Sequence, residues 1–330
     1  MENCTLVYGH ELLGRKDITP MDLLVGLLIL AFCSLQIAFG FVNLWILWNV
    51  KIFYNSFGTI LATRALVDMS SSVLHICYSS YVTISQRADY SPYMAIVAGY
   101  LGYILAGMSC SMHVFLAVNR FTSVYFPLQY RIIFKKENCV RITTVTFIAI
   151  IIAFIIPFTF IPCNLIGYSA SHYGYIMLDC RKPEEKRPFH FGRFLHVACG
   201  ALLCFGAIVI DTATIRKLYV LKKTKQICNN THFKVKVRFT MQSFCQNIPM
   251  FIELVLLTLG DSSPDSSKAF NVTLSFLVTR FTDFVNSTTI IVFNPEARKF
   301  LQSRARLFPT SSISSSRNIY VLPGNNTLNC

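Results

Sequence analysis

The sequence carries little charge for its length. Asp, Glu, Lys and Arg make up 14% of the 330 residues, whereas hydrophobic residues make up 53% and the mean hydropathy is +0.50. Soluble globular domains carry about 25% charged residues, so this composition excludes an ordinary soluble domain. The sequence is therefore that of a membrane protein.

Patterns typical of several function classes are also missing. The sequence has no long soluble domain, no glycine-rich phosphate loop and no detectable internal repeat. No nucleophile, base or metal-binding residues converge, so we expect neither an enzyme nor a bound metal or cofactor. His75 and His113 have no Cys, His or acidic partner at metal-ligand spacing, and we interpret them as packing residues. A secondary transporter remains the alternative to a receptor, although it is expected to show repeated halves with interrupted helices.

Seven apolar runs come close to or exceed the roughly 20 residues that a transmembrane helix requires. They cover about Leu23–Trp48, Phe57–Ile84, Tyr93–Tyr125, Ile142–Ile166, Phe194–Tyr219, Phe239–Leu259 and Ala269–Phe293. The last is the weakest because it contains Arg280 and Asp283, which must face protein or water. The sequence predicts an all-α membrane protein, a seven-transmembrane helix bundle over residues 21–293. An amphipathic eighth helix over 294–308 and a serine-rich, disordered cytoplasmic tail over 309–330 follow.

The basic residues predict the orientation, because short cytoplasmic loops collect Lys and Arg. The side that holds 126–141, 220–238 and the tail carries about twice as many of them as the other side. Residues 1–20 are therefore predicted to be extracellular, and the first helix acts as a signal anchor. The net charge of +14 lies mainly in membrane-proximal loops, so we expect membrane lipids as partners and no nucleic acid. Enforcing topology is an equally good explanation of these charges.

The inner end of the third run holds an unexpected charge. No Asp, Glu, Lys or Arg occurs from Tyr93 to Val118, and Asn119-Arg120-Phe121 then follows, with Pro127 six residues further on. An arginine at this depth is costly unless it faces protein or water, so Arg120 is a functional candidate. The alternative is a side chain that snorkels to the interface.

The segment from Asn119 to Tyr130 resembles two related receptor patterns. Asn119-Arg120-Phe121 and Pro127 resemble the Asp/Glu-Arg-Tyr motif and proline that close the third helix of rhodopsin-like G-protein-coupled receptors. Asn replaces the acid and Phe the tyrosine, a variant similar to the nematode serpentine chemoreceptors of class X. Asn119 would then hydrogen-bond to Arg120, more weakly than a carboxylate would.

The resemblance extends to other helices. It implies that Asp68 is an inward-facing carboxylate that links helices through water or sodium, with Asn43 as its polar neighbour. Pro249 in the sixth helix removes one backbone N–H and weakens the helix there, and Asn286 begins an altered Asn-Pro-x-x-Tyr motif. The implied protein is a multi-pass receptor of the plasma membrane, in cilia of chemosensory neurons. It would bind an extracellular small molecule or peptide and activate a heterotrimeric G protein.

Depth along the helices suggests a ligand site. A rise of about 1.5 Å per residue places Tyr103 roughly 25 Å outward from Arg120. Glu253 and Arg280 lie at similar depth on the sixth and seventh helices, and a buried acid and base there should pair. This pair either joins the two helices or faces the ligand. The candidate ligand contacts are therefore Tyr103, Asn247, Glu253 and Arg280.

Two outer features concern covalent chemistry. Cys163 and Cys180 flank the second outer loop, and a disulfide between them would contribute about 3 kcal/mol in the chain-entropy model. Two free thiols are the alternative. Asn3-Cys4-Thr5 is a glycosylation sequon in the predicted extracellular segment.

The predicted topology can be tested by glycan mapping. Asn3→Gln should remove a glycan from the protein expressed in animal cells, whereas Asn229→Gln should not, because its sequon lies in a predicted cytoplasmic loop. Gel mobility with and without glycosidase treatment measures the difference. A glycan lost with Asn229→Gln instead would invert the orientation.

Overall fold

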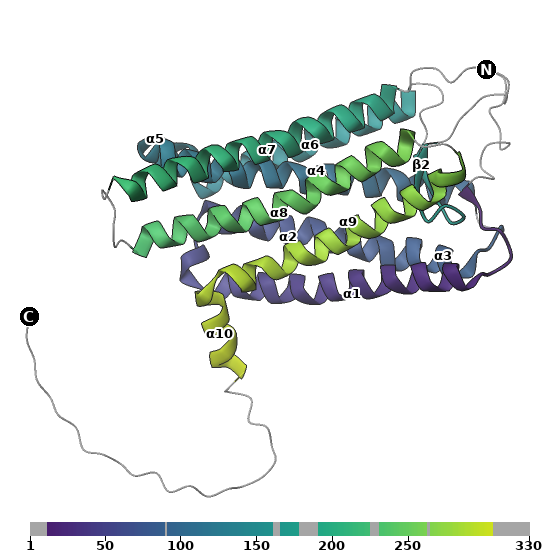
Figure 1. Ribbon diagram of the computed structural model, residues 1–330, viewed down its shortest axis with the longest axis horizontal. Coiled ribbons are helices and arrows are strands. Elements are labelled where there is room, and N and C mark those ends of the chain that lie inside the picture. Colours follow the sequence, from purple (N-terminus) through teal and green to yellow (C-terminus); the bar gives the residue numbers. More distant parts are fainter. Residues whose placement is uncertain are drawn as a thin grey trace, which may run out of the picture.

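Seven long helical segments run side by side in the computed structural model (Figure 1), which describes residues 12–89, 91–160, 166–177, 191–224, 231–262 and 265–305. In chain order they are α1 (Pro20–Asn49), α2 (Ser56–Leu74) continued by the π-helix η3 (His75–Ser80) and α3 (Tyr81–Ser85), α4 (Pro92–Tyr125), α6 (Lys136–Phe160), α7 (Phe191–Lys223), α8 (Thr231–Ser262) and α9 (Asp265–Phe293). The predicted seven-helix bundle is confirmed.

Short elements lie at the two ends of the bundle. The 3-10 turn η2 (Lys51–Phe53) joins α1 to α2, and α5 (Pro127–Ile133) and α10 (Pro295–Ala305) lie at the end predicted to be cytoplasmic (Figure 1). At the opposite end, β1 (Ile166–Ser169) and β2 (Gly174–Met177) form an antiparallel hairpin, with Ile166 paired to Met177. α10 begins close to the predicted start of the eighth helix, and the predicted tail lies outside the described residues.

The predicted fourth span is wrong at its outer end. α6 ends at Phe160, and Ile166, the predicted last residue of that span, begins β1 and is fully buried. An apolar run does not by itself distinguish a helix end from a buried strand. The β-branched Ile166 and the aromatic Tyr168 suit a strand that packs onto the bundle.

Many polar side chains are buried inside the bundle beside an apolar core, and large apolar side chains cover its outer surface. Large apolar side chains on the outer surface include Leu24, Leu27, Ile148, Ile152, Leu202 and Phe205. Buried polar side chains include Arg64, Asp68, Arg120, Asp211, Asn247 and Arg280. This distribution suits a bundle surrounded by lipid, where polar groups must find partners within the protein. Among the described helices, α1, α2–α3, α4, α6 and α7 are long and apolar enough to span a membrane.

Glycines on α4 allow the hairpin to lie directly on the helix. A Cβ at Gly99 would lie 2.8 Å from the carbonyl oxygen of Ile166 in β1. A Cβ at Gly102 would overlap the hydroxyl of Tyr175 in β2. The hairpin therefore packs against the outer half of α4 at a distance that side chains at these two positions would prevent.

This close packing predicts that Gly102→Ala destabilises the protein. The added methyl group would displace the Tyr175 ring, and overpacking of this kind costs about 1–3 kcal/mol. Gly206→Ala on α7 is the matched control, because a Cβ there meets nothing within 4 Å. The midpoint of thermal unfolding in detergent should fall for Gly102→Ala and not for Gly206→Ala. Equal midpoints would contradict the close approach.

Candidate functional site

Arg120 lies inside the bundle at the inner end of α4. The residue is 4% exposed, and its Nη1 lies 3.9 Å from Oδ1 of Asp211 on α7. Its guanidinium carbon lies 4.9 Å from the centre of the Phe57 ring on α2. A snorkelling side chain would reach the interface, so this burial argues against that alternative.

A chain of buried polar groups continues from Asp211 to α8 and back to α4. Asn247 donates from Nδ2 to Asp211 Oδ2 over 2.8 Å. The Oδ1 of Asn247 lies 2.8 Å from Nδ1 of His113, which is two helical turns outward from Arg120 on the same helix. Asp211 and Asn247 are fully buried, and His113 is 2% exposed. One acid and one amide thus connect α4, α7 and α8 in the centre of the bundle.

Asn119 does not contact the neighbouring guanidinium, contrary to the prediction. Its Nδ2 donates to Ser56 Oγ on α2 over 3.2 Å, and that hydroxyl lies 3.0 Å from the Tyr130 hydroxyl on α5. Consecutive residues on a helix point about 100° apart, so Asn119 and Arg120 face different neighbours. The carboxylate near Arg120 belongs instead to Asp211, which reaches it from α7.

The other two residues of the motif shape the cytoplasmic end of α4. Phe121 stacks on Tyr125 with ring centres 4.3 Å apart. Pro127 is the first residue of α5, a position that proline favours because its missing N–H needs no helical partner. The Tyr125 hydroxyl donates to the carbonyl oxygen of Ala213 over 3.1 Å, which adds a second contact between α4 and α7.

A second buried network joins α2, α8 and α9. Arg64 donates from Nη1 to Gln246 Oε1 over 3.1 Å, and Gln246 in turn donates to the carbonyl oxygen of Asn286 over 3.1 Å. Asp68 lies 3.5 Å from Arg64 Nε and accepts a hydrogen bond from Ser109 on α4 over 2.7 Å. The inward position of Asp68 agrees with what the resemblance implies.

The predicted neighbour of Asp68 lies across a small cavity. Asn43 on α1 donates to the carbonyl oxygen of Ser287 on α9 over 2.6 Å. Asn43, Asp68 and Asn286 all line the same cavity.

α8 carries the two residues on which both networks depend. Gln246 reaches α2 and α9, whereas Asn247, the next residue, reaches α4 and α7. Pro249 lies inside α8 two residues further on and leaves the carbonyl group of Cys245 without its helical donor. The missing backbone hydrogen bond of α8 therefore lies next to the side chains that take part in both networks.

In the outer half, an aromatic cluster joins the hairpin to α4 and α9. Tyr175 of β2 contacts the rings of Tyr103 on α4 and Phe276 on α9, with ring centres 5.5 and 5.8 Å away. The Arg280 guanidinium carbon lies 5.4 Å from the centre of the Phe276 ring. Of the predicted ligand contacts, Tyr103 and Arg280 thus belong to this cluster, Tyr103 through Tyr175 and Arg280 through Phe276. Asn247 belongs to the inner network.

Arg280 has polar partners on α9 and α2. Its Nη1 lies 3.1 Å from Asp283 Oδ2 and donates to Ser71 Oγ over 3.1 Å. The side chain of Glu253 lies outside the described residues, so its pairing with Arg280 stays a prediction. Cys163, Cys180 and the sequon at Asn3 also lie outside them. Within the described residues, no group of His, Cys, Asp and Glu could hold a metal ion.

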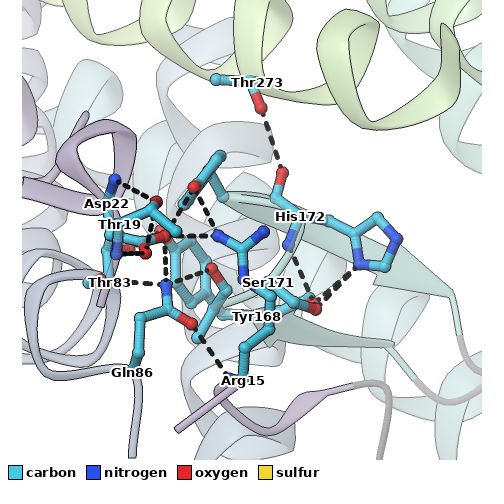
Figure 2. Close-up of polar contacts among 12 residues, drawn as sticks. Arg15, Thr19, Asp22, Thr83, Gln86, Tyr168, Ser171, His172 and Thr273 are labelled. Atoms are coloured by element: carbon cyan, nitrogen blue, oxygen red, sulfur yellow. Dashed lines mark hydrogen bonds and ion pairs between the residues drawn. The ribbon is translucent and has the colours of Figure 1, made fainter. Parts of the chain in front are cut away.

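The hairpin is tied to the N-terminal segment by a network centred on Asp22 (Figure 2). Asp22 caps the start of α1 together with Thr19 and accepts hydrogen bonds from Arg15 and Tyr173 over 2.5 Å each and from Gln86 over 2.8 Å. Burial raises the pKa of the Tyr173 phenol, and its hydrogen bond to Asp22 raises this pKa further. A tyrosine phenol is protonated at neutral pH in any case, and the raised pKa keeps it a donor to the carboxylate in more alkaline solution.

Sequence reasoning missed Asp211 and gave Arg64 no role. Both had a signal: Asp211 is the one carboxylate between Phe191 and Lys223, and Arg64 is a charge inside an apolar span. Ionisable residues within spans mark functional or structural networks. His113 was interpreted as a packing residue, and the structure adds its hydrogen bond to Asn247.

Comparisons with known proteins agree with this architecture. Squid rhodopsin, whose crystal structure is known, has a TM-score of 0.67 to this chain, with 12% identity and 90% of each chain covered. At this identity the likeness concerns the fold alone. A search of curated protein sequences gave no significant match.

The family comparison covers most of the chain. Residues 34–294 match the family model described as "Serpentine type 7TM GPCR chemoreceptor Srx", a range that contains Arg120, Asp211 and Pro249. The chain therefore belongs to the Srx family of serpentine chemoreceptors, which are seven-transmembrane G-protein-coupled receptors.

Proposed function

We propose that this receptor binds an extracellular small molecule or peptide and activates a heterotrimeric G protein through Arg120. The observation that carries the proposal is the state of the Arg120 side chain. It is buried 3.9 Å from Asp211, and its three guanidinium nitrogens have no hydrogen-bond partner among the described residues. Donors of a buried cation that lack a partner are costly. In the proposal, the charge of Asp211 alone holds Arg120, and the guanidinium donors remain available to another partner.

In the proposed inactive state, Asp211 holds Arg120 across the α4–α7 interface. Asn247 restrains Asp211 by donating to its other oxygen. A shift of α8 near Pro249 would move Asn247 and loosen this restraint. Arg120 would then be free to donate to backbone carbonyl groups of a G-protein segment that enters at the cytoplasmic end. Ligand and G protein would thus favour the same arrangement of α7 and α8, and each would strengthen the binding of the other.

The proposed ligand site lies beneath the hairpin. Tyr103 and Arg280 approach the aromatic cluster from α4 and α9, and Tyr175 closes it from the outside. Aromatic rings with one cation and two phenols provide an apolar surface with a few polar contacts, which is the usual composition of a small-molecule site. Glu253 is proposed as a further contact from the sixth helix, and Asn247 as the residue through which the site communicates with Asp211.

The same proposal places the receptor in the plasma membrane with its N-terminus outside, in cilia of chemosensory neurons. Basic residues near the cytoplasmic ends of α7 and α8 then meet anionic lipid and the G protein. Arg238 on α8 lies 3.6 Å from Glu296 on α10, so an ion pair connects these two helices at the cytoplasmic end. The match to a receptor family disfavours the secondary transporter.

The pair predicts that Asp211→Asn raises ligand-independent activity. Loss of the carboxylate charge removes the attraction on Arg120, and each 1.4 kcal/mol lost from the inactive state raises the active population about tenfold. Thr212→Ala is the control, because Thr212 is exposed on the outer surface of the same turn. Nucleotide exchange on co-expressed G proteins, measured without ligand, should rise several-fold for Asp211→Asn only. An unchanged rate at equal surface expression would refute the restraint.

A second prediction concerns Arg120 itself. Arg120→Ala should abolish nucleotide exchange and, in combination with Asp211→Asn, should remove the activity that Asp211→Asn gains. Extracellular ligand binding should remain, because Arg120 lies far from the outer half. Surface expression measured with an N-terminal tag is the control for folding. A double variant as active as Asp211→Asn alone would show that Arg120 is not the signalling residue.

A further inference from the structure

A small cavity lies between α1, α2, α8 and α9, on the cytoplasmic side of the aromatic cluster. Its volume is about 20 Å³, and the polar residues that line it include Gln36, Asn43, Arg64, Asp68, Gln246 and Asn286. Each of these residues is less than a tenth exposed. None of the described residues that form the Arg120 site or the aromatic cluster lines this cavity.

Several polar atoms around the cavity have no hydrogen-bond partner among the described residues. They are Gln36 Nε2, Asn43 Oδ1, Arg64 Nε, Arg64 Nη2 and Asn286 Oδ1. A buried polar group without a partner costs about 1–3 kcal/mol. A cavity that holds a water molecule needs at least about 10–15 Å³ and two to four polar partners. This cavity meets both conditions and offers donors as well as acceptors.

The cavity also contains a buried carboxylate, which is the usual reason for a cation to bind. Oxygen atoms of Asp68, Asn43 and Asn286 are ligands of the kind that hard cations prefer. The resemblance to rhodopsin-like receptors allows either water or sodium at Asp68. The residues present do not fit sodium, because Arg64 lines the same cavity and its Nε lies 3.5 Å from the Asp68 carboxylate. A metal cation there would be repelled by the guanidinium, which already neutralises the acid.

We propose that Arg64 is the resident cation of this cavity and that the cavity holds water in place of a sodium ion. Arg64 differs from a dissolved ion because it is part of α2 and also donates to Gln246 on α8. The link between α2 and α8 therefore does not depend on the sodium concentration. The charge balance inside the receptor would therefore stay the same when the sodium concentration outside the cell changes.

The ion dependence of stability tests this proposal on the purified full chain in detergent. Thermal unfolding is measured in chloride salts of sodium, potassium and N-methyl-D-glucamine at equal ionic strength. The wild-type midpoint should be the same in all three. Arg64→Gln removes the charge and keeps an amide next to Gln246. This variant should gain a sodium-specific, saturable rise of about 2–4 °C, because a ligand that binds only the folded state stabilises it.

Two further variants make the test specific. Adding Asp68→Asn to Arg64→Gln should abolish the sodium response, because the carboxylate is the proposed ligand. Arg238→Gln removes a cation that is 39% exposed at its side chain, and it should show no sodium response.

The wild-type measurement decides the matter even if Arg64→Gln does not fold. A saturable, sodium-specific stabilisation of the wild type would overturn the proposal. A folded Arg64→Gln protein that ignores sodium would overturn the role of Arg64 as the excluding cation. Neither result bears on the G-protein proposal, because no ligand or G protein is present in the measurement.

Discussion

The interior of the bundle is organised by one electrostatic constraint: a charge buried among apolar helices in a membrane needs an opposite charge close by. Three arginines are buried in the described residues, and each has an aspartate within 4 Å. The pairs are Arg64–Asp68 at 3.5 Å, Arg120–Asp211 at 3.9 Å and Arg280–Asp283 at 3.1 Å. In two of these pairs both partners belong to the same helix, α2 for Arg64–Asp68 and α9 for Arg280–Asp283, so they remain together when helices move. Only the pair of Arg120 and Asp211 joins two helices, so among these three it is the one that a rearrangement of the bundle can separate.

α8 connects this separable pair to one of the fixed pairs, Arg64–Asp68. Gln246 contacts Arg64, and Asn247 contacts Asp211. Because consecutive helical residues point about 100° apart, a single rotation of α8 changes both contacts at once. Pro249 lies within one turn of both residues and lowers the local resistance to such a movement. The amides also have a chemical advantage over charged groups at these positions, since an amide both donates and accepts and can exchange partners without leaving a charge unpaired.

The outer end of the bundle is closed by contacts of a different kind. The hairpin lies on glycines of α4, and its tyrosines pack against η3, α4 and α9. Asp22 then ties the hairpin to the N-terminal segment. In the proposal, a ligand that enters from outside meets this hairpin at the aromatic cluster. Signal detection would therefore begin with the packing of aromatic rings and be passed inward to the ion pairs through α8.

Sequence alone determined the features that depend on local composition. The number of spans, the inward position of Asp68, the end of α4 at Tyr125 just before Pro127 and the place of Pro249 within α8 follow from hydropathy and motif. Only the tertiary structure decided which groups meet. It paired Arg120 with Asp211 on α7, turned Asn119 toward Ser56 on α2 and ended α6 before Ile166. Hydropathy fixes the depth of a residue along its helix but not the rotation of that helix about its axis or the identity of its neighbours. Partner choice in a membrane bundle depends on these two quantities, and they are set by packing across the whole fold.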